Sequence, residues 1–274
     1  MSSAVHHLNC ATMAPATAFG GRITPVRMVA HCLLIEREDG LTLVDTGFGT
    51  TDLATRRMGR EFIFSMRPAL DVAETAVAQV RALGHDPAEV TDIVLTHLDL
   101  DHAGGLGDFP GARVHIFADE LAAARAPRGL LEKRRYVADQ WSHNPRWVEH
   151  AIDGEQWLGF DAVRVLSDDV LLVPTQGHTR GHCAVACRRP SGGWFVHAGD
   201  AFFDAREIET PPHCAPGLAV FQRAMQMVPT RKENQQRLRT LHAEHGPASG
   251  ADEVVTVFCA HDAGQYDALA GVTD

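Results

Sequence analysis

Short apolar runs alternate with stretches of helical periodicity along the chain. Residues 32–49 form two apolar runs joined by a turn at Glu38, Asp39 and Gly40, followed by a glycine-containing loop with Asp45. This pattern predicts a β-hairpin that leads into a polar loop. The run at 92–96 is short, almost wholly apolar and rich in β-branched residues, as expected for a buried strand that ends at His97.

The remaining periodicities predict further strands and helices. Apolar residues recur at helical spacing between Asp71 and Gly84, where Asp71 and Glu74 suggest a capping box, so a helix is predicted at 72–83. Thr230 and Glu233 predict a cap for a helix that ends near His245. The other predicted elements are a helix at 118–125 and strands at 113–117, 170–173, 183–188, 194–197 and 254–259.

Residues 51–68 have no clean period, which fits a flap, an insertion or an irregular loop that covers the core. Strands with interspersed helices imply an α/β architecture. We find no repeat and no linker, so we expect a single domain over residues 1–274.

Composition narrows the class of protein. The chain has 274 residues, of which 45% are hydrophobic and 22% charged, as in globular proteins with a substantial core. Its net charge of -10 argues against a nucleic-acid partner, and we expect Lys133, Arg134 and Arg135 to form a solvated face. Six cysteines without a CxxC pair, no leader pattern and no membrane-length apolar run predict a cytoplasmic protein without a membrane partner.

Four potential metal ligands follow the predicted strand at 92–96 within six positions: His97, Asp99, Asp101 and His102. Crowded ionisable side chains at the end of a buried strand repel one another and lose hydration, and a divalent cation relieves both costs. Leucines alternate with these residues, so we expect the side chains at 97, 99 and 101 to point into one cavity. The segment therefore predicts a metal site.

Three more segments place a polar side chain after a predicted strand. His178 lies in a Gly-His-Thr-Arg-Gly-His stretch that also contains His182, while Asp200 follows the strand at 194–197 and His261 follows the last strand. Ligands that project from several strand ends onto one rim are how open sheets build sites. Four histidines lack any such context and are assigned ordinary roles, His213 being the strongest exception: His31, His143, His150 and His213.

The order of these motifs, HxDxDH, GHTxGH, GD and AHD after an Asp-Thr-Gly at 45–47, resembles the metallo-β-lactamase superfamily. The length and motif order are similar to those of its acyl-homoserine lactonase and glyoxalase II-like group. The resemblance implies a four-layer αββα sandwich and two divalent metal ions. It implies that one ion is held by His97, Asp99 and His178, the other by Asp101, His102 and His261, with Asp200 as the bridge, and that Asp45 and His182 orient ligands from behind.

Two positions depart from the usual pattern. Most hydrolases of this superfamily have a histidine where Asp99 stands. Three carboxylates and one hydroxide around two divalent ions make the site formally neutral. Because a carboxylate is a harder ligand than an imidazole, manganese and iron are candidate metals in addition to zinc. The lactonases commonly have a tyrosine three residues after the bridging aspartate, where this chain has Phe203, so another hydrogen-bond donor is needed for a lactone.

The resemblance implies a hydrolase in which a hydroxide activated by a dinuclear metal centre attacks a carboxylic ester, with a lactone or a thioester as the expected substrate. Asp101 is the candidate proton shuttle to the leaving oxygen. A phosphodiesterase and a di-iron oxidoreductase are the alternatives, and we expect a small-molecule substrate and consider a homodimer possible. Apolar residues of two predicted loops are candidates for the substrate pocket: Phe48, Phe62, Phe64, Met66, Phe202 and Phe203.

Overall fold

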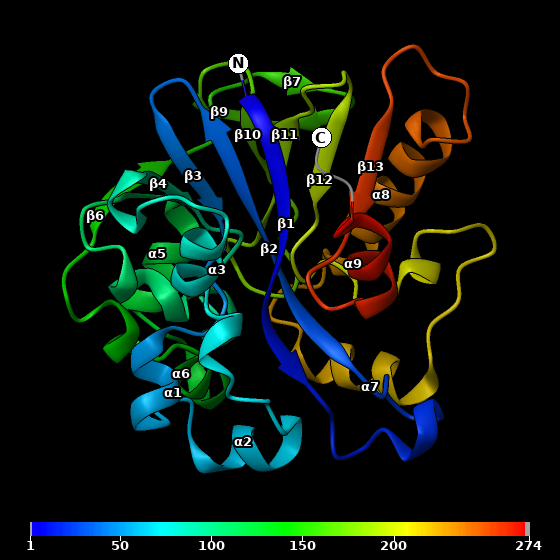
Figure 1. The fold of residues 1–274 in the computed structure, drawn as a ribbon. Helices are drawn as coiled ribbons and strands as arrows, with labels where there is room; N and C mark the ends of the chain where they lie inside the picture. The colour runs from blue at the N-terminus through cyan, green and yellow to red at the C-terminus, as the bar shows by residue number, and fades with distance from the viewer. Residues whose placement is uncertain (1, 272–274) are drawn as a thin grey trace.

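Two mixed sheets pack face to face in the computed structural model, which describes residues 2–271 (Figure 1). The first sheet has β1–β2–β3 antiparallel and β3–β4–β5–β6 parallel. Its strands follow the order of the chain: β1 (Ser2–Met13), β2 (Met28–Arg37), β3 (Gly40–Val44), β4 (Val90–Val94), β5 (Arg113–Phe117) and β6 (Arg146–His150).

The second sheet has its strands in the order β13–β12–β11–β10–β9, with only the β12–β13 pair parallel. A small hairpin formed by β7 (Gln156–Trp157) and β8 (Phe160–Asp161) precedes it in the chain. The bounds of its strands are β9 (Val163–Leu166), β10 (Val170–Pro174), β11 (Cys183–Arg188), β12 (Trp194–His197) and β13 (Val255–Phe258).

Alternating side chains divide the core into layers. Leu33 and Ile35 of β2 face inward and pack with Leu172 of β10 between the sheets. Leu34, on the opposite face of β2, packs in a separate apolar cluster against helices, and Leu171 of β10 does the same on the other sheet. Because successive side chains of a strand point to opposite faces, both faces of each sheet are covered.

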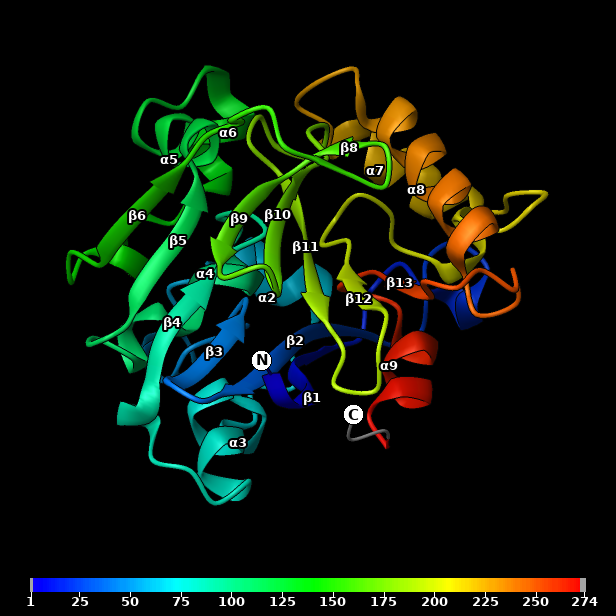
Figure 2. The same ribbon diagram turned by 90° about the horizontal axis from the view of Figure 1, so that it is seen from above.

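Helices form the two outer layers, as Figure 2 shows with α3 and α8 on opposite sides. Helices α3 (Ala76–Ala82) and α5 (Ala118–Arg125) cover the first sheet, and α8 (Arg231–His245) covers the second. The result is the αββα sandwich expected from the motifs. The other helices are α1 (Thr50–Thr55), α2 (Arg60–Met66), α4 (Leu100–Ala103), α6 (Gly129–Arg135), α7 (Pro216–Met225) and α9 (Ala263–Leu269).

One predicted helix start is wrong, and one predicted side-chain cap is absent. Asp71 caps only a 3₁₀ turn at Val72–Glu74, and α3 begins after Thr75, whose extended backbone and hydroxyl cap Ala78 N. The β-branched Thr75 thus divides the predicted helix. Thr230 is the N-cap residue of α8, as predicted, but its hydroxyl donates to the Gln176 carbonyl and makes no capping hydrogen bond.

The segment 51–68, for which a flap or an irregular loop was expected, forms the short helices α1 and α2. Each ends at an arginine in the left-handed region, Arg56 after α1 and Arg67 after α2. Within residues 2–271, no helix is both long and apolar enough to span a bilayer.

Candidate metal centre

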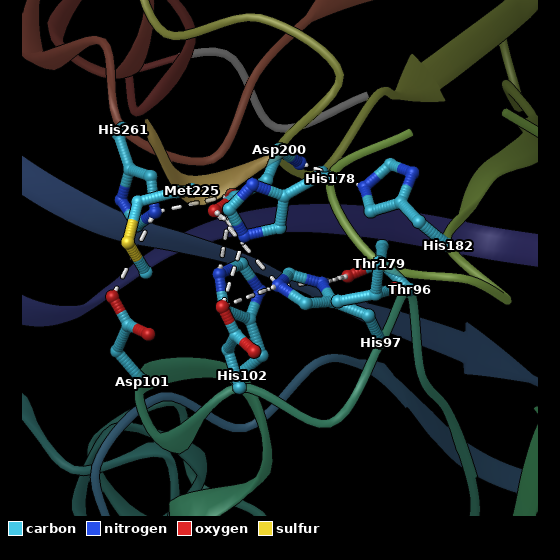
Figure 3. Close-up of polar contacts among 12 residues, drawn as sticks. Thr96, His97, Asp101, His102, His178, Thr179, His182, Asp200, Met225 and His261 are labelled. Carbon is cyan, nitrogen blue, oxygen red and sulfur yellow. Dashed lines mark hydrogen bonds and ion pairs between the residues drawn. The ribbon is translucent and has the colours of Figure 1, made fainter. Parts of the chain in front are cut away.

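The candidate metal ligands lie at one edge of the sandwich, where strands of both sheets end. His97 follows β4, His178 follows β10, Asp200 follows β12 and His261 follows β13. Figure 3 shows the side chains from these separate segments turned toward one another. The carboxyl ends of these strands therefore bring together residues that are far apart in the sequence.

A first group combines His97, Asp99, His178 and Asp200, whose ligand atoms all lie within 4.8 Å of one another. Asp99 Oδ2 is 3.5 Å from His97 Nε2 and 2.9 Å from His178 Nε2. Imidazole nitrogens and carboxylate oxygens this close together match the ligand set of a divalent transition metal.

A second group combines Asp101, His102 and His261. Asp200 lies between the groups, because its Oδ2 is 3.8 Å from His97 Nε2 and 3.2 Å from His178 Nε2. Its Oδ1 is 3.3 Å from His102 Nε2 and 3.1 Å from His261 Nε2. One carboxylate thus presents a different oxygen to each group, the arrangement that a bridging ligand requires.

The orphaned nitrogens of the site fit metal ions. The buried Nε2 atoms of His97 and His102 have no hydrogen-bond partner among the described residues. His102 Nδ1 is 2.8 Å from Asp45 Oδ2, and His261 Nδ1 is 2.7 Å from the Val29 carbonyl oxygen. A proton held on Nδ1 leaves the Nε2 lone pair free, so these residues suit a metal centre.

The segment that carries the first ligands is not extended throughout. Asp99 occupies the N-cap position of α4, so Asp101 and His102 project from a helical turn. Leu98 is fully buried but Leu100 is only half-buried. The predicted alternation is therefore wrong after Asp99, because the chain must turn to reach the second group.

Asp45 holds the loop between the two groups from behind. Its carboxylate accepts hydrogen bonds from Thr96 N at 2.8 Å and from the Thr96 hydroxyl at 2.7 Å, in addition to the contact with His102. Burial opposes its charge, but His102 nevertheless lowers the pKa of Asp45. The ionised carboxylate therefore fixes the tautomer and the direction of the His102 ring.

His182 supports Asp200 through the backbone. Its Nε2 accepts from Asp200 N at 2.9 Å, and its Nδ1 is 3.1 Å from the Thr175 carbonyl oxygen. Both ring nitrogens are thus engaged away from the two groups. Gly199 has a φ of 51°, and a Cβ there would lie 2.7 Å from His182 Nε2, so the close packing of ring and backbone requires glycine.

Glu120 was not identified from the sequence, although it joins the two ligand loops. The fully buried side chain, near the start of α5, accepts from Leu98 N at 3.0 Å and from the Thr179 hydroxyl at 2.6 Å. Its second oxygen also accepts from Gly181 N at 3.1 Å. One carboxylate therefore fixes the separation of the loops that carry His97 and His178.

Glu120→Ala should lower the free energy of unfolding by about 3 kcal/mol, because three donors lose their acceptor inside the core. Chemical denaturation of the metal-free protein measures this loss. Asp119→Ala is the matched control, since Asp119 is exposed on the same turn and its removal should cost less than about 1 kcal/mol. Equal losses in the two variants would contradict the role assigned to Glu120.

Protonation in the metal-free site follows from the buried carboxylates. Burial opposes charge on His102 and His261, but Asp200 raises the pKa of both above the usual range. Burial and the nearby Arg135 lower the pKa of His178 to about 4. Burial also acts against ionised Asp200, yet the surrounding histidines hold its pKa well below the usual value.

Metal binding near neutral pH should release protons, because His102 and His261 must give up theirs to become ligands. Calorimetric zinc titrations at pH 7 in two buffers of different ionisation enthalpy measure this release. The pKa values of His102 and His261 are higher in the folded chain than in the unfolded chain, so their protonation stabilises the metal-free fold. This contribution is complete below about pH 6.5 and is lost as the pH rises through the folded pKa values. An apparent enthalpy of zinc binding that is equal in both buffers would contradict the release of protons.

Arg135 contradicts the predicted solvated face. Lys133 and Arg134 are exposed, but the Arg135 side chain is buried, with 1% of its surface accessible. Its Nη1 donates to Asp99 Oδ2 at 2.6 Å and lies 2.6 Å from His178 Nε2. The guanidinium cancels the charge of Asp99, so the formally neutral site inferred from the sequence gains one positive charge.

The aspartate at position 99 was an indirect signal for a buried cation, but it did not identify Arg135. A carboxylate at position 99 where a neutral imidazole is usual requires a compensating cation in a buried site. Glu132 and Arg135 are buried one helical turn apart on α6, whereas the residues between them are exposed. This burial pattern, which only the folded chain reveals, distinguishes Arg135 from the neighbouring cations.

The structure separates the candidate pocket residues. Phe48 and Phe203 are buried in one apolar cluster, against which Phe62 and Met66 pack. Phe202 is instead fully buried in the core outside the second sheet, and the Phe64 side chain on α2 is 76% exposed. Phe202 therefore packs with the core, because neighbouring residues in the loop point in opposite directions.

The histidines without motif support lie outside both groups. His31 is buried and is 2.7 Å from His7 through their ring nitrogens, and His150 contacts His115 on the first sheet. His143 and His213 are exposed. These positions agree with the prediction that none of the four histidines, His213 included, is a metal ligand.

Comparison with known proteins agrees with this architecture. A probable metallo-hydrolase of Mycobacterium tuberculosis is 40% identical over 267 residues, which cover 96% of this chain and 81% of that protein. An N-acyl homoserine lactonase, AttM of Rhizobium johnstonii, is 33% identical over 161 residues, covering 58% of this chain and 59% of the lactonase.

Solved structures show the same fold. An N-acyl homoserine lactone hydrolase with N-hexanoyl-L-homoserine at its catalytic metal centre superposes with a TM-score of 0.70 at 19% identity, over 98% of this chain and 96% of that one. A dizinc quorum-quenching lactonase, AidC, has a TM-score of 0.56 at 13% identity, over 95% and 85%. Residues 26–256 match the metallo-beta-lactamase superfamily. The chain belongs to the metallo-beta-lactamase superfamily and is a metal-dependent hydrolase of that group.

Proposed function

We propose that this hydrolase opens a carboxylic ester, with a lactone as the first candidate and a thioester as the second. The observation that carries the proposal is Asp200, which offers one oxygen to each of two groups of ligand-type side chains. When bound, two divalent ions in this arrangement lower the pKa of a water molecule and polarise the carbonyl group that it attacks. No side-chain nucleophile is needed.

The protein residues have separate tasks in this proposal. His97, Asp99 and His178 hold one ion, and Asp101, His102 and His261 hold the other, with Asp200 shared between them. Asp45 and His182 keep His102 and Asp200 in place. All of these residues are 9% exposed or less, so the site is largely shielded from bulk water.

Asp101 is assigned the proton transfer. Its Oδ2 is 3.7 Å from His261 Nε2, beside the second group. Asp99 and Asp101 are the most accessible of the seven candidate ligands, so the substrate enters on their side. A carboxylate at this entrance can pass a proton to the oxygen that leaves when the ester bond breaks.

Metal analysis followed by a substrate panel tests the proposal. The protein should bind two ions per chain and hydrolyse γ-butyrolactone or an N-acyl homoserine lactone faster than a β-lactam. Thioesters and bis-p-nitrophenyl phosphate complete the panel. Two bound ions without turnover of any lactone or thioester would reject ester hydrolysis.

Phosphodiester hydrolysis is an alternative to ester hydrolysis because of Arg135. Its guanidinium next to Asp99 removes the neutrality that argued against an anionic substrate. Paired metal ions also hold phosphoryl oxygens. Turnover of bis-p-nitrophenyl phosphate in preference to lactones would favour this second function.

A further inference from the structure

Arg135 is a buried cation placed between two candidate metal ligands. Nη1 contacts Asp99 Oδ2 and His178 Nε2, each at 2.6 Å, and Nη2 donates to the Met225 carbonyl oxygen at 2.6 Å. The residue therefore joins the end of α6 to the end of α7 directly over the first group.

Metal binding changes what Nη1 can contact. The Nε2 lone pair of His178 cannot accept a hydrogen bond from Arg135 and bind a metal ion at the same time. Asp99 has a second buried oxygen, Oδ1, without a partner among the described residues. Asp99 can thus bind a metal ion through one oxygen and accept a hydrogen bond from Arg135 with the other. The Nη1 hydrogen that pointed to His178 then becomes free.

The freed hydrogen lies at the first group, near which Phe203 offers no hydrogen-bond donor. The Phe203 ring is stacked on His261, with centroids 5.0 Å apart and an interplanar angle of 22°, and it is 5.8 Å from the His178 ring. It presents only carbon there. Tyr136, next to Arg135, is buried in the core outside the first sheet, and burial together with Glu120 raises the pKa of its hydroxyl, which stays protonated.

We propose that Arg135 contacts the substrate, donating from Nη1 to the carbonyl oxygen of the ester and to the carboxylate of the product. This inference rests on the proposed function and supplies the donor that Phe203 lacks. When the oxygen of water adds to the carbonyl carbon, the π electrons move to the carbonyl oxygen. The electron pair on the carbonyl oxygen then re-forms the C=O bond as the ester C–O bond breaks. One proton of the water goes to the leaving oxygen and the other is released to solvent, which leaves the product as a carboxylate.

Arg135 keeps its proton throughout these steps. It stabilises the negative charge that collects on the carbonyl oxygen, and a charge-assisted hydrogen bond is about twice as strong as a neutral one. Asp99 holds the guanidinium at this place, which explains why a carboxylate is useful at position 99. A neutral imidazole has a single lone pair, so it could not bind a metal ion and accept a hydrogen bond from the guanidinium at the same time.

Acetate binding to the cobalt-loaded protein tests the contact without any turnover. Acetate represents the carboxylate of the product, and the visible absorption of Co²⁺ reports its binding at the centre. Arg135→Gln should weaken acetate binding by about tenfold to a hundredfold, with two cobalt ions still bound. Arg135→Lys retains the buried charge and should give an intermediate affinity.

Arg180→Gln is the matched control. Arg180 pairs with Glu132 of α6 at 2.8 Å and also donates to the carbonyl oxygens of Ala123 and Ala126. It contacts no candidate ligand, so its loss perturbs the anchoring of α6 and the end of α5 without removing a contact to the metal groups. Tyr136→Phe removes the neighbouring hydroxyl. Both variants should bind acetate within about twofold of the unaltered protein. An unchanged acetate affinity in Arg135→Gln, or an equal loss in Arg180→Gln, would overturn the proposal.

Lactone kinetics separate this inference from the proposed function. Arg135→Gln should lower kcat more than it raises KM, since the contact strengthens as charge develops. If the unaltered protein hydrolyses lactones and Arg135→Gln matches its kcat and KM, the inference fails while the function stands. If no lactone is hydrolysed but acetate binding still requires Arg135, the function fails and the anion contact stands.

Discussion

Asp200→Asn should reduce hydrolysis by about a thousandfold or more and leave fewer than two metal ions per chain. The side chain keeps its size, but one of its two oxygens is replaced by an amide nitrogen that cannot bind a cation. Since Oδ1 and Oδ2 face different groups, either orientation of the amide deprives one group of its shared ligand. Metal analysis and turnover on the same sample measure both effects.

Asp262→Asn is the matched control for this experiment. Asp262 adjoins His261, but its carboxylate caps α9 and accepts from Ala205 N, outside the metal groups. It should retain two metal ions and most of the turnover. Full metal content and full activity in Asp200→Asn would rule out the bridging role.

Asp99→His should destabilise the protein by about 3–5 kcal/mol, because it leaves the Arg135 guanidinium buried without its carboxylate. The exchange restores the more usual ligand but removes the anion that Arg135 requires. The double variant with Arg135→Gln should recover most of this loss. Thermal and chemical denaturation of the two single variants and the double variant give the coupling energy.

The same variants test metal preference. A histidine at position 99 is a softer ligand than a carboxylate, so competition among zinc, manganese and iron should move toward zinc in the double variant. An unchanged metal ranking would contradict the role given to Asp99. Equal stability of the single and double variants would contradict the pairing with Arg135.

The regular elements were predicted well wherever the local pattern is strong. β5, α5, β11 and β12 have the predicted bounds, since the strands are short, largely apolar runs and α5 is a segment rich in alanine. Weaker signals failed. β1 and the helices α6 and α7 were not predicted, and Thr75 rather than Asp71 begins α3, because caps depend on the local backbone as much as on residue type.

The order of motifs along the chain was enough to indicate the fold, the family and the segments that carry potential ligands. Each motif follows a strand, and strand ends are defined locally by the apolar run before them. Arg135, Glu120 and the opposite directions of Phe202 and Phe203 emerged only from the folded chain. Their roles depend on contacts between segments far apart in sequence, and neither local periodicity nor composition specifies which buried charge meets which partner.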